Sequence, residues 1–329
     1  MAYHIAFLAR WSLIGLVLAI LLKAESHSKK PLSSLYVAPS DIYTPDFYPN
    51  GTDLKLPMGT MRYWLFGNPE GRRVILIHGI ATGAATYDKL GRSLAESGHQ
   101  VLVYDLFGRG YSDAPAGLYD ESLYTTQIAL LLQKVGWDKT DVVGVSLGGG
   151  IAASFAAYYP EIVDRLVLIA PAGLMQEKDI PLTGKLVKLP LLSKIALHPW
   201  LRPVALRGIT QFFKSSRKGD QTTADAVKVQ KIAFHQFAHH PGFLRAFFGT
   251  LTDYPLHDLH ERYKAVGQNK DLPVLVLWGD ADKTVPFEYH KVLKEYVPQA
   301  KVSRYEGGGH DIILTDAERV DKEVADFLA

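Results

Sequence analysis

The chain has 329 residues, of which 47% are hydrophobic and 21% are charged, a composition typical of a folded globular protein rather than a disordered one. Lysine and arginine number 36 against 34 aspartates and glutamates, and no long basic stripe occurs, so we expect no nucleic acid partner. The sequence contains no cysteine, which excludes disulfides, thiolate metal sites and thiol nucleophiles.

The first 23 residues have the character of a membrane or targeting segment. Residues 5–22 are apolar except for Arg10 and Ser12, a length near the lower limit of about 17 residues for a membrane-spanning helix. The uncharged part also suits the hydrophobic region of a cleaved signal peptide. We therefore expect residues 1–23 to be a signal anchor or a signal peptide, and the protein to be membrane-associated or in the secretory pathway. A helix packed on the protein itself is the third interpretation.

The body of the chain alternates short apolar runs with helix-like patterns. Residues 24–58 are rich in Pro, Ser, Lys and Tyr without clear periodicity, and we interpret them as a connector. The expected strands after it are 61–66, 73–77, 101–104, 141–145, 165–169, 273–278 and 301–305, and the expected helices include 86–96 and 122–135. Continuous apolar runs indicate parallel strands buried on both faces. The sequence therefore predicts an α/β fold with a doubly wound, mostly parallel sheet.

The alternation stops between Gly173 and Asp271, where the apolar residues follow helical spacing and no strand is predicted. A structureless loop of this length is improbable in a compact domain, so we expect an inserted helical cap at residues 174–271. The core is then formed by residues 59–173 and 272–329. Seven phenylalanines of the expected cap suit a substrate pocket and suit packing on the sheet equally well: Phe212, Phe213, Phe234, Phe237, Phe243, Phe247 and Phe248.

Ser146 is the candidate nucleophile. It lies at the centre of Gly144-Val145-Ser146-Leu147-Gly148, which follows an apolar strand and precedes a predicted helix of small residues. A tight strand-to-helix turn that exposes a serine needs small residues two positions before and after it. The alternative is a structural or phosphate-binding turn, but dinucleotide and Walker loops require a different spacing of glycines.

A serine hydroxyl is a weak nucleophile unless a base removes its proton, and the base needs a carboxylate to orient it. Two aspartates, Asp280 and Asp282, follow the predicted strand 273–278, and His310 follows three glycines after the predicted strand 301–305. Ligands of open α/β sheets bind at the carboxyl ends of the strands. We therefore expect a serine, an aspartate and a histidine to meet there, in that order along the chain.

These motifs resemble those of the α/β-hydrolase superfamily, and the resemblance extends from about residue 59 to the C-terminus. His78-Gly79-Ile80 and the turn 105–112 (DLFGRGYS) match two further motifs of that superfamily. The resemblance implies that Asp282, in a Gly-x-x-Asp pattern, is the catalytic acid rather than Asp280. It also implies that His78 shapes a loop and takes no direct part in the chemistry.

The resemblance further implies an oxyanion hole, which stabilises the negative oxygen of a tetrahedral intermediate. In this superfamily one backbone N–H follows the nucleophile and another comes from the loop after the first long strand, which correspond to Leu147 and Ile80. Removal of one such donor typically lowers the rate by about 10²- to 10³-fold. We therefore expect both backbone groups to matter, whatever side chains they carry.

The function predicted from these residues is hydrolysis of a lipid-like or other small hydrophobic ester through an acyl-enzyme on Ser146, with no cofactor. A serine at this position argues against epoxide and halide chemistry, which needs an aspartate nucleophile. A carbon–carbon bond hydrolase, an acyltransferase with the same triad, and a non-catalytic ligand-binding protein remain alternatives. His235 and His239 have i, i+4 spacing beside His240, but without an HExxH pattern we expect no metal site.

Overall fold

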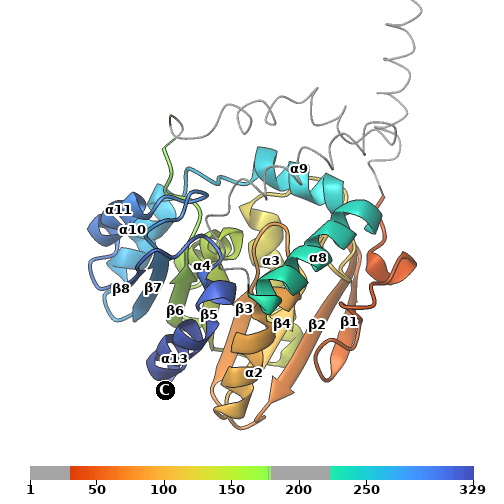
Figure 1. Ribbon diagram of the computed structural model, residues 1–329, viewed down its shortest axis with the longest axis horizontal. Coiled ribbons are helices and arrows are strands. Elements are labelled where there is room, and N and C mark those ends of the chain that lie inside the picture. Colours follow the sequence, from red (N-terminus) through yellow and green to blue (C-terminus); the bar gives the residue numbers. More distant parts are fainter. Residues whose placement is uncertain (1–29, 177, 179–222) are drawn as a thin grey trace, which may run out of the picture.

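The computed structural model describes residues 30–176, 178 and 223–329, which form an eight-stranded sheet flanked by helices (Figure 1). The strand order is β1-β2-β4-β3-β5-β6-β7-β8. The strands are β1 (Gly51–Leu56), β2 (Gly59–Gly67), β3 (Arg73–Ile77), β4 (Gln100–Tyr104), β5 (Thr140–Val145), β6 (Val163–Ile169), β7 (Val274–Gly279) and β8 (Lys301–Tyr305). Strand β2 pairs antiparallel with β1 and β4, and all other pairs are parallel. The predicted doubly wound, mostly parallel sheet is confirmed.

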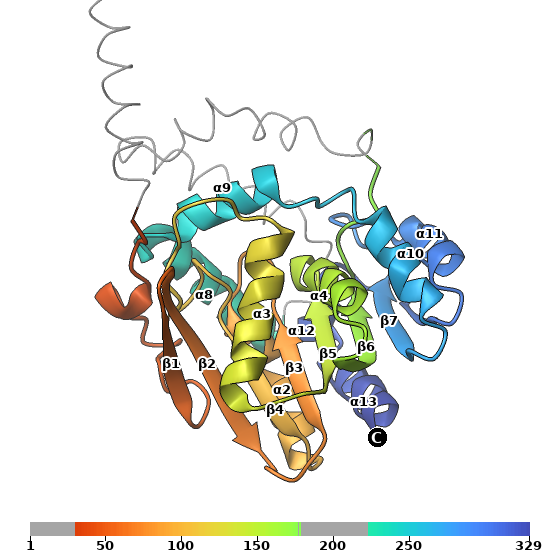
Figure 2. The same cartoon turned by 180° about the vertical axis from the view of Figure 1, so that it is seen from behind.

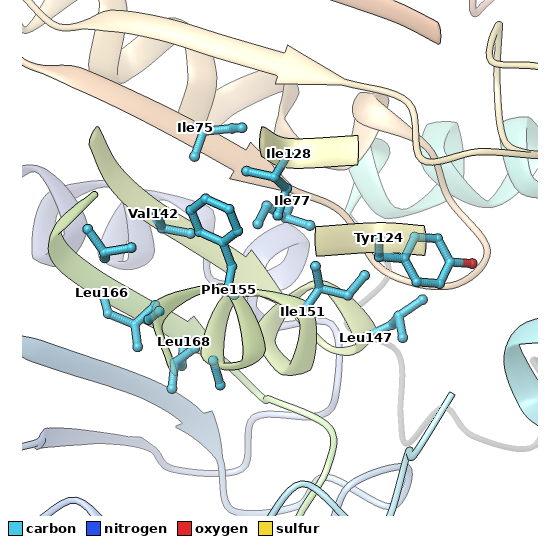
Figure 3. Close-up of a cluster of buried hydrophobic side chains, with 14 of the residues drawn as sticks. Ile75, Ile77, Tyr124, Ile128, Val142, Leu147, Ile151, Phe155, Leu166 and Leu168 are labelled. Atoms are coloured by element: carbon cyan, nitrogen blue, oxygen red, sulfur yellow. The ribbon is translucent and has the colours of Figure 1, made fainter. Parts of the chain in front are cut away.

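Helices cover both faces of this sheet, as the two opposite views show (Figures 1 and 2). One face carries α2 (Asp88–Glu96) and α13 (Ala317–Leu328), with the short α12 (Ile312–Thr315) preceding α13. The other face carries α3 (Glu121–Val135), α4 (Leu147–Tyr158), α10 (His260–Gln268) and α11 (His290–Tyr296). Each face buries its own hydrophobic cluster. Figure 3 shows part of the cluster in which β3, β5 and β6 pack against α3 and α4.

Local sequence signals explain where the helices begin and end. The carboxylate of Asp120 accepts a hydrogen bond from the backbone N–H of Leu123 at 3.0 Å, which caps the first turn of α3. The same helix ends at Gly136, whose φ of 70° is left-handed and therefore suits glycine. Helix α8 (Ala224–His239) begins in the same way, because the hydroxyl of Thr223 accepts from Ala226 N–H at 3.2 Å.

The segment that we interpreted as a connector contributes to the folded body. Strand β1 lies within it, and the rings of Tyr43 and Tyr48 are fully buried. The hydroxyl of Tyr43 donates to Asp105 at 2.7 Å, and that of Tyr48 donates to the carbonyl of Ala84 at 3.0 Å. The sequence did not reveal β1 because it is a half-exposed edge strand in which no residue is buried, so its apolar pattern is weak.

Two helices from the expected cap, α8 and α9 (Phe243–Asp253), lie across the end of the sheet at which the parallel strands finish (Figure 1). Helix α10 packs on α4 beside the sheet. Residues 1–23 and much of the expected cap lie outside the described residues, so the division into core, cap and N-terminal segment stays a prediction. Within residues 30–176, 178 and 223–329, no helix has both the length and the apolar character needed to cross a membrane.

Candidate active site

Ser146 occupies the sharp turn between β5 and α4. Its φ of 56° is left-handed, a conformation that residues other than glycine rarely adopt. The turn is fixed from both sides, because Ser146 N–H donates to the carbonyl of Ile169 at 2.9 Å and its own carbonyl accepts from Ala172 N–H at 3.0 Å. These bonds hold a strained residue at the carboxyl end of a central strand, which is typical of a functional position.

The glycines around Ser146 are required by close backbone contacts. A Cβ atom on Gly144 would lie 2.2 Å from the carbonyl oxygen of Gly148, and one on Gly148 would lie 1.9 Å from the carbonyl oxygen of Ile77. Both neighbours are backbone atoms, which cannot rotate away as a side chain can. The two glycines therefore let the chain turn tightly enough to present Ser146.

The structure brings the three predicted side chains together. The Nε2 atom of His310 lies 2.9 Å from Oγ of Ser146, and its Nδ1 atom lies 2.7 Å from Oδ2 of Asp282. Ser146 follows β5, Asp282 follows β7 and His310 follows β8, so three parallel strands deliver them to the same edge of the sheet. Both distances are within hydrogen-bonding reach, which is the geometry needed for proton transfer from the serine to the imidazole.

Backbone N–H groups hold the carboxylate of Asp282 in place. Its side chain is fully buried, and its Oδ1 atom accepts from the backbone N–H groups of Thr284 at 2.8 Å and Val285 at 2.9 Å. The neighbouring Asp280 instead forms an ion pair with Arg304 and accepts from Gly307 N–H. Asp280 therefore stabilises the loop after β8, and of the two aspartates Asp282 is the one that contacts the imidazole.

Two opposing effects act on the imidazole of His310. Burial works to lower its pKa, while the charge of Asp282 and the hydrogen bond that the ring donates to that carboxylate work to raise it. The raising effects prevail, and the pKa of His310 lies above its ordinary value. The carboxylate thus stabilises the imidazolium that would form when His310 takes a proton.

Of the two residues predicted to form an oxyanion hole, one follows Ser146 in the chain and the other follows Gly79, which lies beside Ser146. Leu147 follows Ser146 directly as the first residue of α4, where its N–H has no acceptor within the helix. On the other side, a Cβ atom built on Gly79 would lie 3.5 Å from Cβ of Ser146 and 3.9 Å from its Oγ. Gly79 therefore borders the serine, and Ile80, the predicted donor, is the next residue in the chain.

The loop of residues 78–83, which follows β3 and which we call the oxyanion loop, is held by the buried imidazole of His78. Nε2 of this ring accepts from Leu106 N–H at 2.9 Å, so Nδ1 carries the proton and donates to the carbonyl of Gly79 at 2.7 Å. Burial lowers the pKa of His78 to about 3, which keeps the ring neutral. His78 thus orients the peptide that carries Ile80 N–H, and it does not contact Ser146 through any of these bonds.

Sequence reasoning gave no role to two further buried polar side chains at this site. Gln236 of α8 donates to the carbonyl of Thr82 at 3.2 Å and accepts from Gly110 N–H at 2.6 Å. Arg109, in the turn after β4, donates to the carbonyl of Ile80 at 3.0 Å. The glutamine has no distinguishing pattern in its helix, and the 105–112 motif that contains Arg109 does not tell which groups its side chain contacts, so only their positions in space reveal these contacts.

An aromatic cluster from α8 and α9 packs on the oxyanion loop. Phe237, Phe243, Phe247 and Phe248 are buried together with Leu244 and Ala81, and Ile80 packs against them. Phe212 and Phe213 lie outside the described residues. The rings of His235 and His239, considered for a metal, are in tilted contact, and Nε2 of His235 donates to the carbonyl of Ala38 at 3.0 Å. Within the described ranges no group of three or more potential metal ligands occurs.

Comparisons with known proteins show which family the chain resembles. Residues 68–318 match the family described as serine aminopeptidase, S33. The chain is 27% identical over 258 residues to lipase 1 of Psychrobacter immobilis, covering 74% of this chain and 73% of that protein. It is 26% identical over 270 residues to 2-hydroxymuconate semialdehyde hydrolase of Pseudomonas putida, covering 79% and 88%.

A solved structure supports the same fold. A bromoperoxidase from Bacillus anthracis superposes with a TM-score of 0.70 at 23% identity, covering 84% of this chain and 99% of that one. At this identity the likeness concerns the fold alone. The family match, in contrast, covers most of the chain from residue 68 onward. The chain therefore belongs to the serine aminopeptidase S33 family of hydrolases, within the α/β-hydrolase superfamily.

Proposed function

We propose that this protein is a serine hydrolase that cleaves carboxylic esters with an apolar acyl group, through an acyl-enzyme on Ser146. The observation that carries the proposal is the continuous chain of hydrogen bonds from Ser146 Oγ through His310 to Asp282. Lipase 1, one of the relatives, bears the name of an ester hydrolase, which supports this choice within the family.

In the first half of the reaction, Nε2 of His310 takes the hydroxyl proton of Ser146 as Oγ bonds to the ester carbonyl carbon. The carbonyl oxygen becomes negative and would be met by the N–H groups of Ile80 and Leu147. As the tetrahedral intermediate collapses, the bond to the alcohol oxygen breaks and His310 gives its proton to that oxygen. The alcohol leaves, and the acyl group stays bonded to Ser146.

In the second half, His310 takes a proton from a water molecule, and the water oxygen attacks the acyl carbonyl carbon. Collapse of this intermediate breaks the bond to Oγ of Ser146, and the proton held by His310 returns to the serine. A carboxylic acid is released and the enzyme is regenerated. Asp282 keeps its charge throughout and pairs with the imidazolium at each protonated stage.

The aromatic cluster supports an apolar acyl group as the substrate feature. Phe237, Phe243 and Phe247 bring apolar surface from the cap helices onto Ile80, one of the two proposed oxyanion donors. An acyl chain extending from the reacting carbonyl toward this cluster would leave water for an apolar surface, at about 0.8 kcal/mol for each buried methylene group. Longer acyl chains should therefore raise kcat/KM until they extend beyond this apolar surface.

A carbon–carbon bond hydrolase is the second candidate. It would use the same triad, and the relative from Pseudomonas putida is named as a hydrolase of 2-hydroxymuconate semialdehyde. A third activity, release of an amino acid from a peptide, is suggested by the family's description alone. We therefore propose to measure kcat/KM on three substrate types: p-nitrophenyl esters of two to twelve carbons, a 2-hydroxy-6-oxo-dienoate, and aminoacyl p-nitroanilides.

The ester proposal predicts the highest kcat/KM on the esters, with an optimum at a medium or long acyl chain. Greater kcat/KM on the dienoate or on the anilides would reject it in favour of one of the other two activities. Ser146→Ala is the control in each assay, because any turnover that survives this substitution does not come from the triad.

We also propose that residues 1–23 attach the protein to a membrane or direct it into the secretory pathway, as their apolar composition suggests. Deletion should stop at residue 29, because Lys30 and Leu32 already contact the body: the carbonyl of Lys30 accepts from Arg245, and Leu32 pairs with Ala114. Loss of membrane sedimentation with unchanged kcat/KM is the expected result. Equal sedimentation of both forms would reject attachment by this segment.

A further inference from the structure

Arg109 has an unusual environment for an arginine. It lies in the turn between β4 and α3, and its side chain is completely buried. Arginine is almost never fully buried unless a carboxylate pairs with it. Within residues 30–176, 178 and 223–329, every partner of its guanidinium is neutral. The site therefore holds a positive charge that no described carboxylate neutralises.

The guanidinium is nevertheless fully hydrogen-bonded. Nε donates to the carbonyl of Ile80 at 3.0 Å, and one terminal nitrogen donates to the carbonyl of Phe107 at 2.9 Å and to the hydroxyl of Tyr124 at 2.8 Å. The other donates to Oγ1 of Thr250 at 2.9 Å and to the carbonyl of Ala246 at 3.4 Å. All five N–H groups of the side chain thus have an acceptor.

These acceptors come from four different parts of the fold. Ile80 belongs to the oxyanion loop, Phe107 to the turn itself, Tyr124 to α3, and Thr250 to α9. The hydroxyl groups of Tyr124 and Thr250 also bond to each other at 2.6 Å, which closes the network between α3 and α9. In the view of Figure 3, Tyr124 lies at the same end of the buried cluster as Leu147, the other proposed oxyanion residue.

The charge of Arg109 acts electrostatically on the oxyanion loop. It contributes to the lowering of the pKa of His78, the residue that orients the peptide between Gly79 and Ile80. The charge of Arg109 repels a positive charge on the loop. By the same electrostatic interaction it would stabilise a negative charge there. The low polarisability of a buried site strengthens this effect.

We propose that Arg109 is a positioning residue that fixes the oxyanion loop against cap helix α9 and places a buried positive charge behind the oxyanion hole. It acts through the carbonyl of Ile80 and does not touch the substrate. This inference rests on the proposed function, because it concerns the oxyanion formed on Ser146. It adds a role for the cap: α9 helps to hold the backbone donor in place through Thr250.

The test compares Arg109→Gln and Arg109→Lys with wild type on the best p-nitrophenyl ester. Because a displaced oxyanion donor can cost about 10²-fold, Arg109→Gln should lower kcat by about 10- to 100-fold with KM changed less than about twofold. Arg109→Lys keeps the charge but has three N–H donors in place of five, so it should recover only part of the loss. Inhibition by a trifluoromethyl ketone, which forms a tetrahedral oxyanion on the serine, should weaken by the same factor as kcat.

Arg165→Gln is the matched control, since Arg165 also donates to a backbone carbonyl, that of Leu328, but at the opposite end of the sheet. It should leave kcat and inhibitor affinity unchanged.

A milder pair of substitutions covers the case in which Arg109→Gln does not fold. Thr250→Val removes one acceptor and should lower kcat by about 3- to 10-fold, whereas Thr250→Ser keeps the hydroxyl and should resemble wild type.

The outcomes separate this inference from the proposed function. If wild type neither hydrolyses esters nor forms the ketone adduct, the proposed function fails. If wild type does both, and folded Arg109→Gln or Thr250→Val matches its kcat and inhibitor affinity, the role of Arg109 is refuted while the hydrolase stands. A loss confined to KM would also refute it, because the oxyanion exists only after substrate binds.

Discussion

Nε2 of His310 lies 2.9 Å from Oγ of Ser146, although the two residues are 164 positions apart in the chain. The contact exists because parallel strands β5 and β8 end at the same edge of the sheet; Ser146 directly follows β5, and His310 lies in the loop after β8. The same edge holds Asp282, so the fold delivers nucleophile, base and acid without any further element. The site is thus a direct product of the strand order.

The pH dependence of kcat/KM should report the pKa of His310. The imidazole can accept the serine proton only when it is neutral, so kcat/KM should rise as the pH rises through that pKa. Since Asp282 raises the pKa of His310, the midpoint should lie above the ordinary value of about 6.5. The measurement is kcat/KM on one ester between pH 5 and pH 9, taken below KM.

Asp282→Asn tests the cause of that midpoint. Without the carboxylate, burial lowers the pKa of the imidazole and only the smaller effect of the Asp311 charge raises it, so the midpoint should move to lower pH. The rate on the plateau should fall by about 10⁴-fold, as expected when the histidine loses its orienting carboxylate. Asp280→Asn is the matched control and should leave the midpoint in place, because Asp280 pairs with Arg304 rather than with His310. A common midpoint in all three proteins would contradict the assignment.

Most of the sheet could be predicted from the sequence, since buried parallel strands are continuous apolar runs. The runs 73–77 and 301–305 have the bounds of β3 and β8. The edge strand β1 was not predicted because all of its residues are exposed or half-exposed, so it has no continuous run of apolar residues. The candidate triad could be predicted because each member follows a recognisable strand, whereas the bonds of Arg109 depend on four separate segments and leave no local pattern.

Gly148→Ala should destabilise the protein severely. The new Cβ would lie 1.9 Å from the carbonyl oxygen of Ile77, and backbone must move to make room, at a cost of about 3 kcal/mol or more in the free energy of unfolding. Gly91→Ala is the matched control in α2, where the Cβ meets side-chain atoms at 3.5 Å and should stabilise by about 0.5 kcal/mol. Urea unfolding measures both, and equal stabilities would show that the turn is looser than described.

The strain at Ser146 predicts a second effect on stability. Glycine adopts a φ of 56° without penalty, whereas alanine shares the strain of serine. Both substitutions remove the nucleophile, so both should abolish activity. Ser146→Gly should nevertheless be more stable than Ser146→Ala by about 1 kcal/mol, the lower range of backbone strain at such positions. If thermal and urea unfolding rank alanine above glycine, the turn does not store strain.

Residues 30–58 should contribute to stability through Tyr43. Its hydroxyl donates to the buried carboxyl of Asp105 at 2.7 Å, and hydrogen bonds to charged groups are worth about 1.5 to 3 kcal/mol. Tyr43→Phe should lower the free energy of unfolding by that amount. Tyr36→Phe is the control, because Tyr36 is 42% exposed and bonds to Asp53 in contact with water. A loss of less than 0.5 kcal/mol, roughly the range of surface substitutions, is expected for this variant.

The most direct measurement of the central claim is covalent labelling of Ser146 by a fluorophosphonate, which reacts with a serine that a base has activated. Wild type should gain one phosphonyl group, located on Ser146 by peptide mass spectrometry, and His310→Gln should react at least about a hundredfold more slowly because its base is gone. A folded wild-type protein that is not labelled, or is labelled at a different residue, would contradict the account.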